Sequence, residues 1–195
     1  MTRFAASMQE HREELVKLDT AIGDGDHGTN MDRGMRKALE KLGAQEQADA
    51  ASVLKTVAMA LISSVGGAAG PLYGTLFLQM GTPLSGKQEI DLSSYAAAWR
   101  KGAEGVQARG KAQLGDKTMV DALMPAVEAL EQASDLDAGL RAAAQAAERG
   151  MRDTIPLVAL KGRASYLGER SRDHQDPGAT STNYLCQTAA EALAS

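Results

Sequence analysis

Apolar residues recur every three or four positions along most of this sequence, which is the spacing that gathers side chains on one face of an α-helix. Within residues 30–42 the apolar side chains that follow this spacing are Met31, Met35, Ala38, Leu39 and Leu42. The chain also contains 35 Ala but only 8 Val and 4 Ile, so strong helix formers far outnumber the β-branched residues that favour strands. We therefore expect an all-α protein, and we identify no segment as a strand.

The number of such segments predicts about eight helices in one domain. A chain of 195 residues fits a single domain and is long enough to bury a hydrophobic core. The predicted helices span residues 4–18, 30–42, 51–64, 72–80, 93–108, 118–132, 137–160 and 177–194. Glycine-rich or polar segments separate them and are predicted to be loops, above all residues 19–28, 66–71, 81–88, 110–117 and 161–176.

Individual residues predict three details of these helices. The helix over 51–64 has a wide apolar face and is expected to be central. Pro156 lacks an N–H group and should kink the helix over 137–160. Asp176 is placed to cap the last helix, with Pro177 at its first position.

Charge and apolar content argue against several classes of protein. The net charge is −4, from 21 basic and 25 acidic residues, whereas nucleic-acid-binding proteins usually carry a basic excess. No stretch approaches the roughly 18 uninterrupted apolar residues of a transmembrane helix, and no apolar signal core follows Met1. The single cysteine, Cys186, suits a reducing compartment. We expect a cytoplasmic protein that binds neither nucleic acid nor membrane.

The segment most informative about function has three aspartates within eight residues, at Asp19, Asp24 and Asp26. Their carboxylates repel one another unless a cation lies between them, and the glycines around them let the backbone bend so that they converge. Ligand sets made only of oxygen suit a hard cation such as Mg²⁺ or Ca²⁺. The segment is therefore predicted to bind a divalent cation, with a solvated acidic turn as the alternative.

Three known motifs come close to matching and fail. Residues 23–28 fit the letters G-x-G-x-x-G, but two aspartates there would repel the pyrophosphate of a dinucleotide unless a metal ion lay between them. An EF-hand that starts at Asp24 would need Gly in place of Thr29 and Glu in place of Met35. Residues 81–88 nearly spell a P-loop, but Gln88 occupies the position of the required Ser or Thr, so we interpret them as an ordinary connection.

Two further loops could bind phosphate. Residues 66–70 are rich in glycine and lead into a helix, whose free N–H groups attract anions; tight helix packing is the alternative. The loop over 161–176 contains four cations that could hold a phosphate: Lys161, Arg163, Arg170 and Arg172. The alternative for that loop is a solvated segment of mixed charge.

Single residues near these loops have both a functional and a structural interpretation. His27 could bond a phosphate or brace an aspartate, and Asp176 could act only as a helix cap. Leu72 and Met119 could line a base pocket or belong to the core. Cys186 is expected to pack in the last helix, without a basic neighbour in the sequence to activate it.

Taken together, these segments resemble subunit L of dihydroxyacetone kinase, the nucleotide-binding subunit family. The matching stretches follow in order along nearly the whole chain: LDTAIGDGDHGTNMDRG at 18–34, SSVGGAAGPLYGT at 63–75, GAEGVQARGKAQLGDKTM at 102–119 and KGRASYLGERSRDHQDPGATS at 161–181. The resemblance implies a helical barrel. The expected fold is thus an all-α, single-domain barrel or bundle of about eight helices, with one nucleotide-binding domain over residues 1–195.

The resemblance also implies roles for individual residues. Asp19, Asp24 and Asp26 would hold two Mg²⁺ ions that bridge the phosphates of ADP or ATP, and Arg163 would add a further cation during phosphoryl transfer. The residues expected to contact the nucleotide are His27, Gly28, Thr29, Asn30, Ala68, Ala69, Gly110, Met119, Arg163, Asp176, Pro177 and Gly178. The family is expected to have Ser where this chain has Ala69, so the phosphate loop lacks one hydroxyl here. Thr29 stands at a position that can be apolar in relatives, so its hydroxyl need not be functional.

We expect the form of the kinase that depends on the phosphotransferase system, because 195 residues leave no room for a substrate domain beside the nucleotide domain. The resemblance then implies that ADP stays bound, that a phosphohistidine carrier, subunit M, rephosphorylates it, and that subunit K holds dihydroxyacetone. The alternatives are a kinase subunit for another short ketose or polyol, an ADP–Mg²⁺-binding regulator of a transcription factor, and a structural helical domain with an acidic turn.

Overall fold

The computed structural model describes residues 1–44, 46–87 and 89–193. These residues form nine α-helices and two 3₁₀ helices, and they contain no strand. The α-helices are α1 (Thr2–Glu10), α2 (Arg12–Ile22), α3 (His27–Gly43), α4 (Ala50–Ser64), α5 (Ala69–Gly81), α6 (Leu92–Gly110), α7 (Val120–Glu131), α8 (Leu136–Asp153) and α9 (Pro177–Leu193), and the 3₁₀ helices are η1 (Thr82–Leu84) and η2 (Arg163–Ser171). The expected all-α fold class is confirmed.

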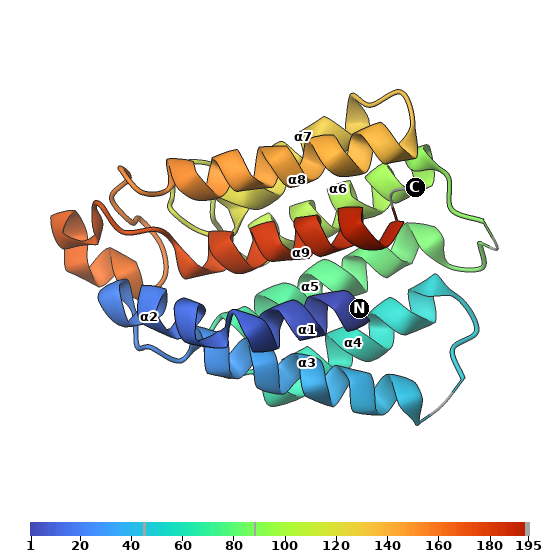
Figure 1. Cartoon of the computed structure of the whole chain (residues 1–195), viewed down its shortest axis with the longest axis horizontal. Helices are drawn as coiled ribbons and strands as arrows, with labels where there is room; N and C mark the ends of the chain where they lie inside the picture. The colour runs from blue at the N-terminus through green and yellow to red at the C-terminus, as the bar shows by residue number, and fades with distance from the viewer. Residues whose placement is uncertain (45, 88, 194–195) are drawn as a thin grey trace.

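The helices lie alongside one another (Figure 1), and their contacts close into a ring around one main hydrophobic core. Each helix from α3 to α8 packs against the next one in the sequence, and α9 returns to α1, which in turn packs against α3. Large side chains fill the ring and are almost completely buried, among them Phe4, Leu61, Tyr73, Phe77 and Leu123. The architecture is therefore the helical barrel that the resemblance implies. Within the described ranges, no helix is both long and apolar enough to cross a lipid bilayer.

The helix predicted over 4–18 is two helices, because the chain turns at His11. The His11 backbone has φ −91° and ψ 12°, and its N–H donates to the Ser7 carbonyl at 2.9 Å. The His11 ring stacks on Tyr184 of α9 with the ring centroids 4.1 Å apart, and Tyr184 also donates a hydrogen bond to Glu14 of α2. The turn thus involves a contact with the last helix, which the local sequence does not reveal.

The expectation that the helix over 51–64 is central is wrong. The corresponding helix, α4, packs against α3 and α5 and forms part of the barrel wall. Its outward-facing side chains are exposed, Met59 to 50 % and Ile62 to 42 %. Apolar residues on this outer face widened the apolar stripe, so the sequence pattern overstated how deeply the helix is buried.

The helix predicted over 137–160 ends before Pro156 instead of kinking there. α8 stops at Asp153, three residues before the proline. Proline disfavours the helical conformation of the residue before it and has no N–H to continue the helix, which is consistent with this early end. The chain then runs through residues 154–176, here called the α8–α9 segment, which contains η2.

The last helix begins where the sequence predicts. Asp176 Oδ2 accepts a hydrogen bond from the Ala179 N–H at 2.7 Å, so the predicted cap is confirmed, and Pro177 is the first helical residue. Cys186 is buried in this helix, as expected, and burial raises the pKa of its thiol to about 12. The predicted end of the helix at Ala194 lies outside the described residues.

The connection predicted over 81–88 starts at the end of α5 and contains η1. Leu84 is buried in the core, and the Gly86 N–H donates to Asp49 Oδ2 at 2.9 Å, which attaches the connection to the start of α4. Gln88 lies outside the described residues. The described part of this near-P-loop therefore packs against the barrel wall.

α7 and α8 approach each other closely at Gly150. A Cβ atom at Gly150 would lie 2.0 Å from the Asp121 carbonyl oxygen of α7. In a regular helix the Asp121 carbonyl would accept the N–H of residue 125, but that residue is Pro125, which has no N–H. The carbonyl therefore has no helical partner and stays turned toward α8. Only glycine fits this contact without moving one helix away from the other.

We expect Gly150→Ala to lower the free energy of unfolding by about 1–3 kcal/mol, because the added methyl group would meet a backbone oxygen that cannot rotate away. Urea unfolding followed by circular dichroism would measure the change. Gly43→Ala is the matched control, since a Cβ there meets no atom within 4 Å. A midpoint for Gly150→Ala equal to that of the wild type would contradict the packing described here.

Candidate functional site

A pocket of about 370 Å³ opens at one end of the barrel. Because neighbouring helices from α2 to α9 run in alternating directions, the α2–α3, α4–α5, α6–α7 and α8–α9 connections all lie at that end (Figure 1). Each of these four connections contributes residues to the pocket lining. The loops that the sequence singles out for chemistry therefore meet in space.

Asp19 lies in the last turn of α2 and not in a loop as predicted. The loop predicted over 19–28 is only four residues long, from Gly23 to Asp26, because α2 continues to Ile22 and α3 starts at His27. Asp19 is buried, and its Oδ2 accepts hydrogen bonds from the backbone N–H groups of Asp26 at 2.9 Å and His27 at 3.0 Å. One carboxylate oxygen thus holds the start of α3, while Oδ1 remains for another partner.

Gly23 allows the chain to turn directly over Asp19. A Cβ atom at Gly23 would lie 2.0 Å from Asp19 Oδ1. Any larger residue at this position would push the carboxylate out of its place, so the glycine is needed for the geometry of the acidic loop.

The three aspartates converge as the sequence predicts. Asp19, Asp24 and Asp26 each offer a carboxylate oxygen, and these oxygens all lie within 4.8 Å of one another. All three residues line the pocket, and Asp24 Oδ2 also pairs with Arg163 Nε at 3.0 Å. A set of oxygen donors at this spacing fits a hard divalent cation such as Mg²⁺, which prefers carboxylates and water as ligands. The residues present therefore fit the predicted metal.

The start of α5 gives the pocket a site for an anion. Gly66, Gly67, Ala68 and Ala69 line the pocket, and α5 begins at Ala69, three residues earlier than predicted. No side chain caps this helix, so the N–H groups of its first turn keep their capacity to bond a ligand. The start of α5 and the acidic loop thus belong to one pocket. The helix start suits a phosphate, and the acidic loop suits the metal ion bound to that phosphate.

The Gly66–Gly70 loop also serves packing, which was the structural alternative. Gly67 has a left-handed backbone with φ +64°, and a Cβ atom at Gly70 would lie 2.4 Å from the Val65 carbonyl oxygen. Tight packing and phosphate binding are therefore compatible here, because the same glycines leave the loop backbone without side chains where it faces the pocket.

The remaining wall of the pocket is largely apolar. Leu72 of α5, Val106 and Gly110 of α6, and Ala112 and Met119 of the α6–α7 connection line it. Of these, Val106, Ala112 and Met119 also belong to the main core. Met119 is thus both a core residue and part of the pocket lining, and its contact with a nucleobase stays a prediction. A flat aromatic ring such as a nucleobase fits a wall of this chemistry.

His27 is fixed in orientation at the start of α3. Its Nε2 lies 2.9 Å from Ser181 Oγ, which in turn lies 2.7 Å from Tyr73 Oη. Burial lowers the pKa of His27, although the neighbouring aspartates act in the opposite direction. His27 lines the pocket with its ring held by the hydrogen bond to Ser181.

Three of the predicted nucleotide contacts lie outside the pocket lining. Gly28 packs against α2, where a Cβ atom would lie 2.1 Å from the Arg12 carbonyl oxygen. Thr29 is exposed, and Asn30 Oδ1 accepts a hydrogen bond from Arg33 at 2.6 Å. Their role as phosphate contacts stays a prediction.

The start of α9 and residues 161–164 close the pocket on the remaining side. Arg163, Asp176, Pro177 and Gly178 all line it, and their contact with a nucleotide stays a prediction. Burial raises the pKa of Asp176 to about 7, with a smaller opposing contribution from the Ala179 N–H bond. The carboxylate of Asp121 also raises this pKa, whereas Lys117 lowers it.

The raised pKa of Asp176 predicts a pH dependence of stability. The folded protein holds this proton up to about pH 7, whereas the unfolded chain releases it near the ordinary value of 3.8. The contribution of Asp176 to the free energy of unfolding is therefore complete below the pKa of the unfolded chain and is lost as the pH rises through the pKa of the folded protein. Between about pH 5 and about pH 8 this contribution falls by about 2–3 kcal/mol. We expect Asp176→Asn, which keeps an oxygen for the cap, to lose this contribution.

Urea unfolding of the nucleotide-free protein at several pH values would measure the difference between Asp176→Asn and wild type. The wild type should lose stability relative to the variant as the pH rises. Two parallel stability curves would show that Asp176 does not titrate in this range.

Sequence reasoning missed three residues that shape the site. Lys117 is buried at the pocket wall, Ser181 hydrogen-bonds to His27, and Tyr73 hydrogen-bonds to Ser181. Nothing in the local sequence marks Lys117 as buried, because the carbonyl groups around it come from distant residues. A row of small polar residues at the start of α9, including Thr180, Ser181 and Thr182, was a usable signal, since these residues face a core in which polar groups need partners.

Comparison with known families matches residues 21–191 to the DAK2 domain. The chain is 47 % identical over 191 residues to the "PEP-dependent dihydroxyacetone kinase, ADP-binding subunit DhaL" of Escherichia coli (strain K12). The aligned region covers 96 % of this chain and 91 % of that protein. It is 36 % identical over 196 residues to the "D-erythrulose kinase" of Mycolicibacterium smegmatis, covering 97 % of this chain but 34 % of that longer protein.

A solved structure has the same fold. The dihydroxyacetone kinase from C. freundii in complex with AMP-PNP and Mg²⁺ superposes with a TM-score of 0.73 at 25 % identity. The match covers 96 % of this chain and 32 % of that kinase, so the chain spans about a third of its length.

Proposed function

This chain belongs to the DAK2 domain family, and from that premise we propose that it is the ADP-binding subunit of a dihydroxyacetone kinase that depends on the phosphotransferase system. In this proposal, a phosphohistidine carrier, subunit M, gives its phosphoryl group to tightly bound ADP as the phosphorus–nitrogen bond breaks. The ATP formed then passes the group to a hydroxyl oxygen of dihydroxyacetone on subunit K. The products are dihydroxyacetone phosphate and the bound ADP.

One observation supports the proposal above all. The carboxylates of Asp19, Asp24 and Asp26 converge in the same pocket as the uncapped start of α5. Carboxylates this close repel one another unless cations offset their charge, and Arg163 pairs with one of the three, Asp24. The N–H groups at the uncapped start of α5 can bond an anion in place of water. A divalent cation bound to a phosphate chain satisfies both.

The residues take the following parts in the proposal, which treats residues 1–195 as one nucleotide-binding domain. Asp19, Asp24 and Asp26 hold two Mg²⁺ ions. When bound, these ions offset the negative charge of the phosphates. The proposed nucleotide contacts are His27, Gly28, Thr29, Asn30, Ala68, Ala69, Gly110, Met119, Arg163, Asp176, Pro177 and Gly178.

The chain contributes position and charge to the transfer step. Phosphoryl transfer depends on alignment and on neutralisation of charge more than on covalent chemistry by the protein. Arg163 supplies a cation at the rim of the pocket, and the first turn of α5 supplies backbone N–H groups. We assign removal of the ketose proton to subunit K, since in this proposal the ketose is held there.

Nucleotide retention and turnover test this function separately. We expect protein purified without added nucleotide to release ADP on denaturation, detected by chromatography and mass spectrometry. Added phosphocarrier, subunit K and dihydroxyacetone should then yield dihydroxyacetone phosphate. Bound ADP without turnover would favour a regulator that signals through a transcription factor, and the absence of any bound nucleotide would contradict the proposal.

A second substrate is favoured by relatives that carry the name of an erythrulose kinase, among them the D-erythrulose kinase of Mycolicibacterium smegmatis. Because the ketose would sit on subunit K, this chain could serve a kinase for another short ketose equally well. The same turnover assay with erythrulose in place of dihydroxyacetone distinguishes the two. The cytoplasmic location expected from the sequence belongs to the same proposal, and cell fractionation tests it.

A further inference from the structure

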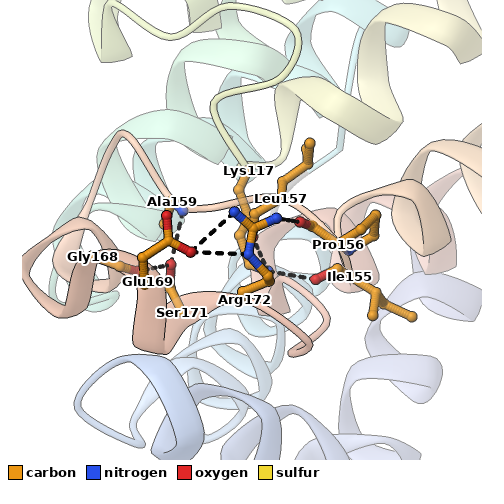
Figure 2. Close-up of polar contacts among 9 residues, drawn as sticks. All are labelled: Lys117, Ile155, Pro156, Leu157, Ala159, Gly168, Glu169, Ser171 and Arg172. Carbon is orange, nitrogen blue, oxygen red and sulfur yellow. Dashed lines mark hydrogen bonds and ion pairs between the residues drawn. The ribbon is translucent and has the colours of Figure 1, made fainter.

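Lys117 is a buried cation in the α6–α7 connection. The residue is only 1 % exposed, and its backbone is left-handed with φ 62°. Its Nζ donates hydrogen bonds to the carbonyl oxygens of Thr154 at 2.8 Å, Leu157 at 3.0 Å and His174 at 2.5 Å. The Ile155 carbonyl oxygen lies 3.3 Å away, as a fourth acceptor for the three N–H groups of the ammonium (Figure 2).

These four carbonyl groups belong to the two ends of the α8–α9 segment. Thr154, Ile155 and Leu157 lie where the chain leaves α8, and His174 lies just before it enters α9. A single ammonium therefore ties the entry and the exit of this segment together. The ends are also joined directly, since the Asp173 N–H donates to the Ile155 carbonyl at 2.8 Å.

The rest of the segment has its own internal contacts, which Figure 2 shows. Arg172 donates to the Pro156 carbonyl at 2.7 Å and pairs with Glu169. Ser171 donates to the Gly168 carbonyl and accepts the Ala159 N–H. The segment is thus a preformed unit whose position on the barrel depends on where its two ends are fixed.

The α8–α9 segment forms one side of the pocket. Its residues 161–164 line the pocket, and Arg163 contacts Asp24 of the acidic loop. Its apolar underside forms a small separate cluster in which Ala159 and Ala164 pack on Ile22 of α2. Lys117 itself precedes Thr118 and Met119, which also line the pocket, so the lysine links the α6–α7 part of the lining to the segment.

The burial of a charged group at this point is unfavourable, and the hydrogen bonds to the four carbonyl oxygens offset that cost. Burial lowers the pKa of Lys117, whereas the carboxylates of Asp176 and Asp173 act in the opposite direction. An apolar side chain in the same place would leave the Leu157 and His174 carbonyls without this partner, and unsatisfied buried carbonyls are unfavourable. The lysine therefore serves as the hydrogen-bond donor for these carbonyl groups and is not a packing residue of the hydrophobic core.

We propose that Lys117 is a positioning residue for the nucleotide: by fixing both ends of the α8–α9 segment, it keeps Arg163 and the Asp176–Gly178 turn closed over the ligand and slows its release. The inference rests on the proposed function, since it takes an adenine nucleotide as the occupant of the pocket. It assigns Lys117 an effect on the rate of release, exerted through the segment and without contact to the reacting atoms.

The test compares Lys117→Met with Lys111→Met. Lys111 lies in the same connection and also has a left-handed backbone, with φ 50°, but its side chain is exposed. We expect Lys117→Met to release a fluorescent ADP analogue in the presence of Mg²⁺ roughly tenfold faster or more, because hydrogen bonds from a charged group are lost at both ends of the segment. Lys111→Met should release it at the wild-type rate. Stopped-flow displacement by excess unlabelled ADP measures both.

Chemical rescue separates positioning from general loss of stability. Lys117→Ala removes the side chain beyond Cβ, and added propylammonium replaces the missing atoms and the charge. We expect propylammonium to slow ADP release from Lys117→Ala, and a tetramethylammonium control, which cannot donate hydrogen bonds, to have no effect. Propylammonium that raises the melting temperature without slowing release would overturn the positioning role.

A measurement on the unmodified protein covers the case in which these variants do not fold. ADP with Mg²⁺ is expected to slow amide hydrogen exchange in residues 154–176 more than in α4, which does not line the pocket. Equal release rates for Lys117→Met and wild type, or unchanged exchange in the segment, would overturn the inference. A wild-type protein that binds no ADP at all would instead overturn the proposed function.

Discussion

Asp24→Ala is expected to weaken the binding of ADP with Mg²⁺ by about 100-fold or more while leaving the helices intact. Asp24 is an exposed residue of the four-residue loop between α2 and α3, and its side chain pairs with Arg163 at the pocket rim. The substitution removes one of the three carboxylates that converge in the pocket and the ion pair with Arg163, but Asp24 lies in a loop and its side chain is not buried in the core. Isothermal titration calorimetry would measure the affinity, and circular dichroism the helix content.

Glu10→Gln serves as the control for this prediction. It removes the same single negative charge from an exposed position on α1, outside the pocket lining. Its affinity for ADP–Mg²⁺ should equal that of the wild type. If Asp24→Ala also bound with unchanged affinity, the assignment of the aspartates to a metal ion would be wrong.

Asp19→Ala is expected to reduce both ligand binding and the stability of the free protein. Asp19 Oδ2 accepts the N–H groups of Asp26 and His27, so its removal leaves two donors at the start of α3 without their partner. The loss of two hydrogen bonds to a charged acceptor should lower the free energy of unfolding by about 2–4 kcal/mol. Urea unfolding of the nucleotide-free protein would show it.

Asp19→Asn separates the two roles of this residue. The amide keeps one oxygen that can accept the N–H groups but loses the charge that a cation requires. We expect it to retain more stability than Asp19→Ala and to bind ADP–Mg²⁺ as weakly. An Asp19→Ala protein that unfolds at the wild-type urea concentration would show that the carboxylate does not hold the start of α3.

Most of the fold could be predicted because helix formation depends on local spacing and composition. The errors arose where distant contacts decided the outcome. The break at His11 coincides with a stack on Tyr184 in the last helix, and the exposure of Ile62 on α4 depends on which neighbours the barrel supplies. Local periodicity reports which side chains are apolar, but it cannot report what covers them.

The acidic part of the site was also predictable, because three carboxylates so close in the sequence need a common explanation. The structure brings Asp19, Asp24 and Asp26 together, although Asp19 belongs to a helix. Lys117 was not predictable, since an isolated lysine between Asp116 and Thr118 is typical of an exposed loop. Its burial follows from four carbonyl groups that lie at least 37 residues away in the chain.

The sequence by itself determined that this protein is helical and where its acidic and glycine-rich loops lie, because both depend on residues close together in the chain. Only the tertiary structure decided that four such loops share one pocket and that Lys117 fixes one of them. The physical reason is that helices of alternating direction bring every second connection to the same end of the barrel. Hydrogen bonds across that end then depend on distances in space, which the order of residues does not contain.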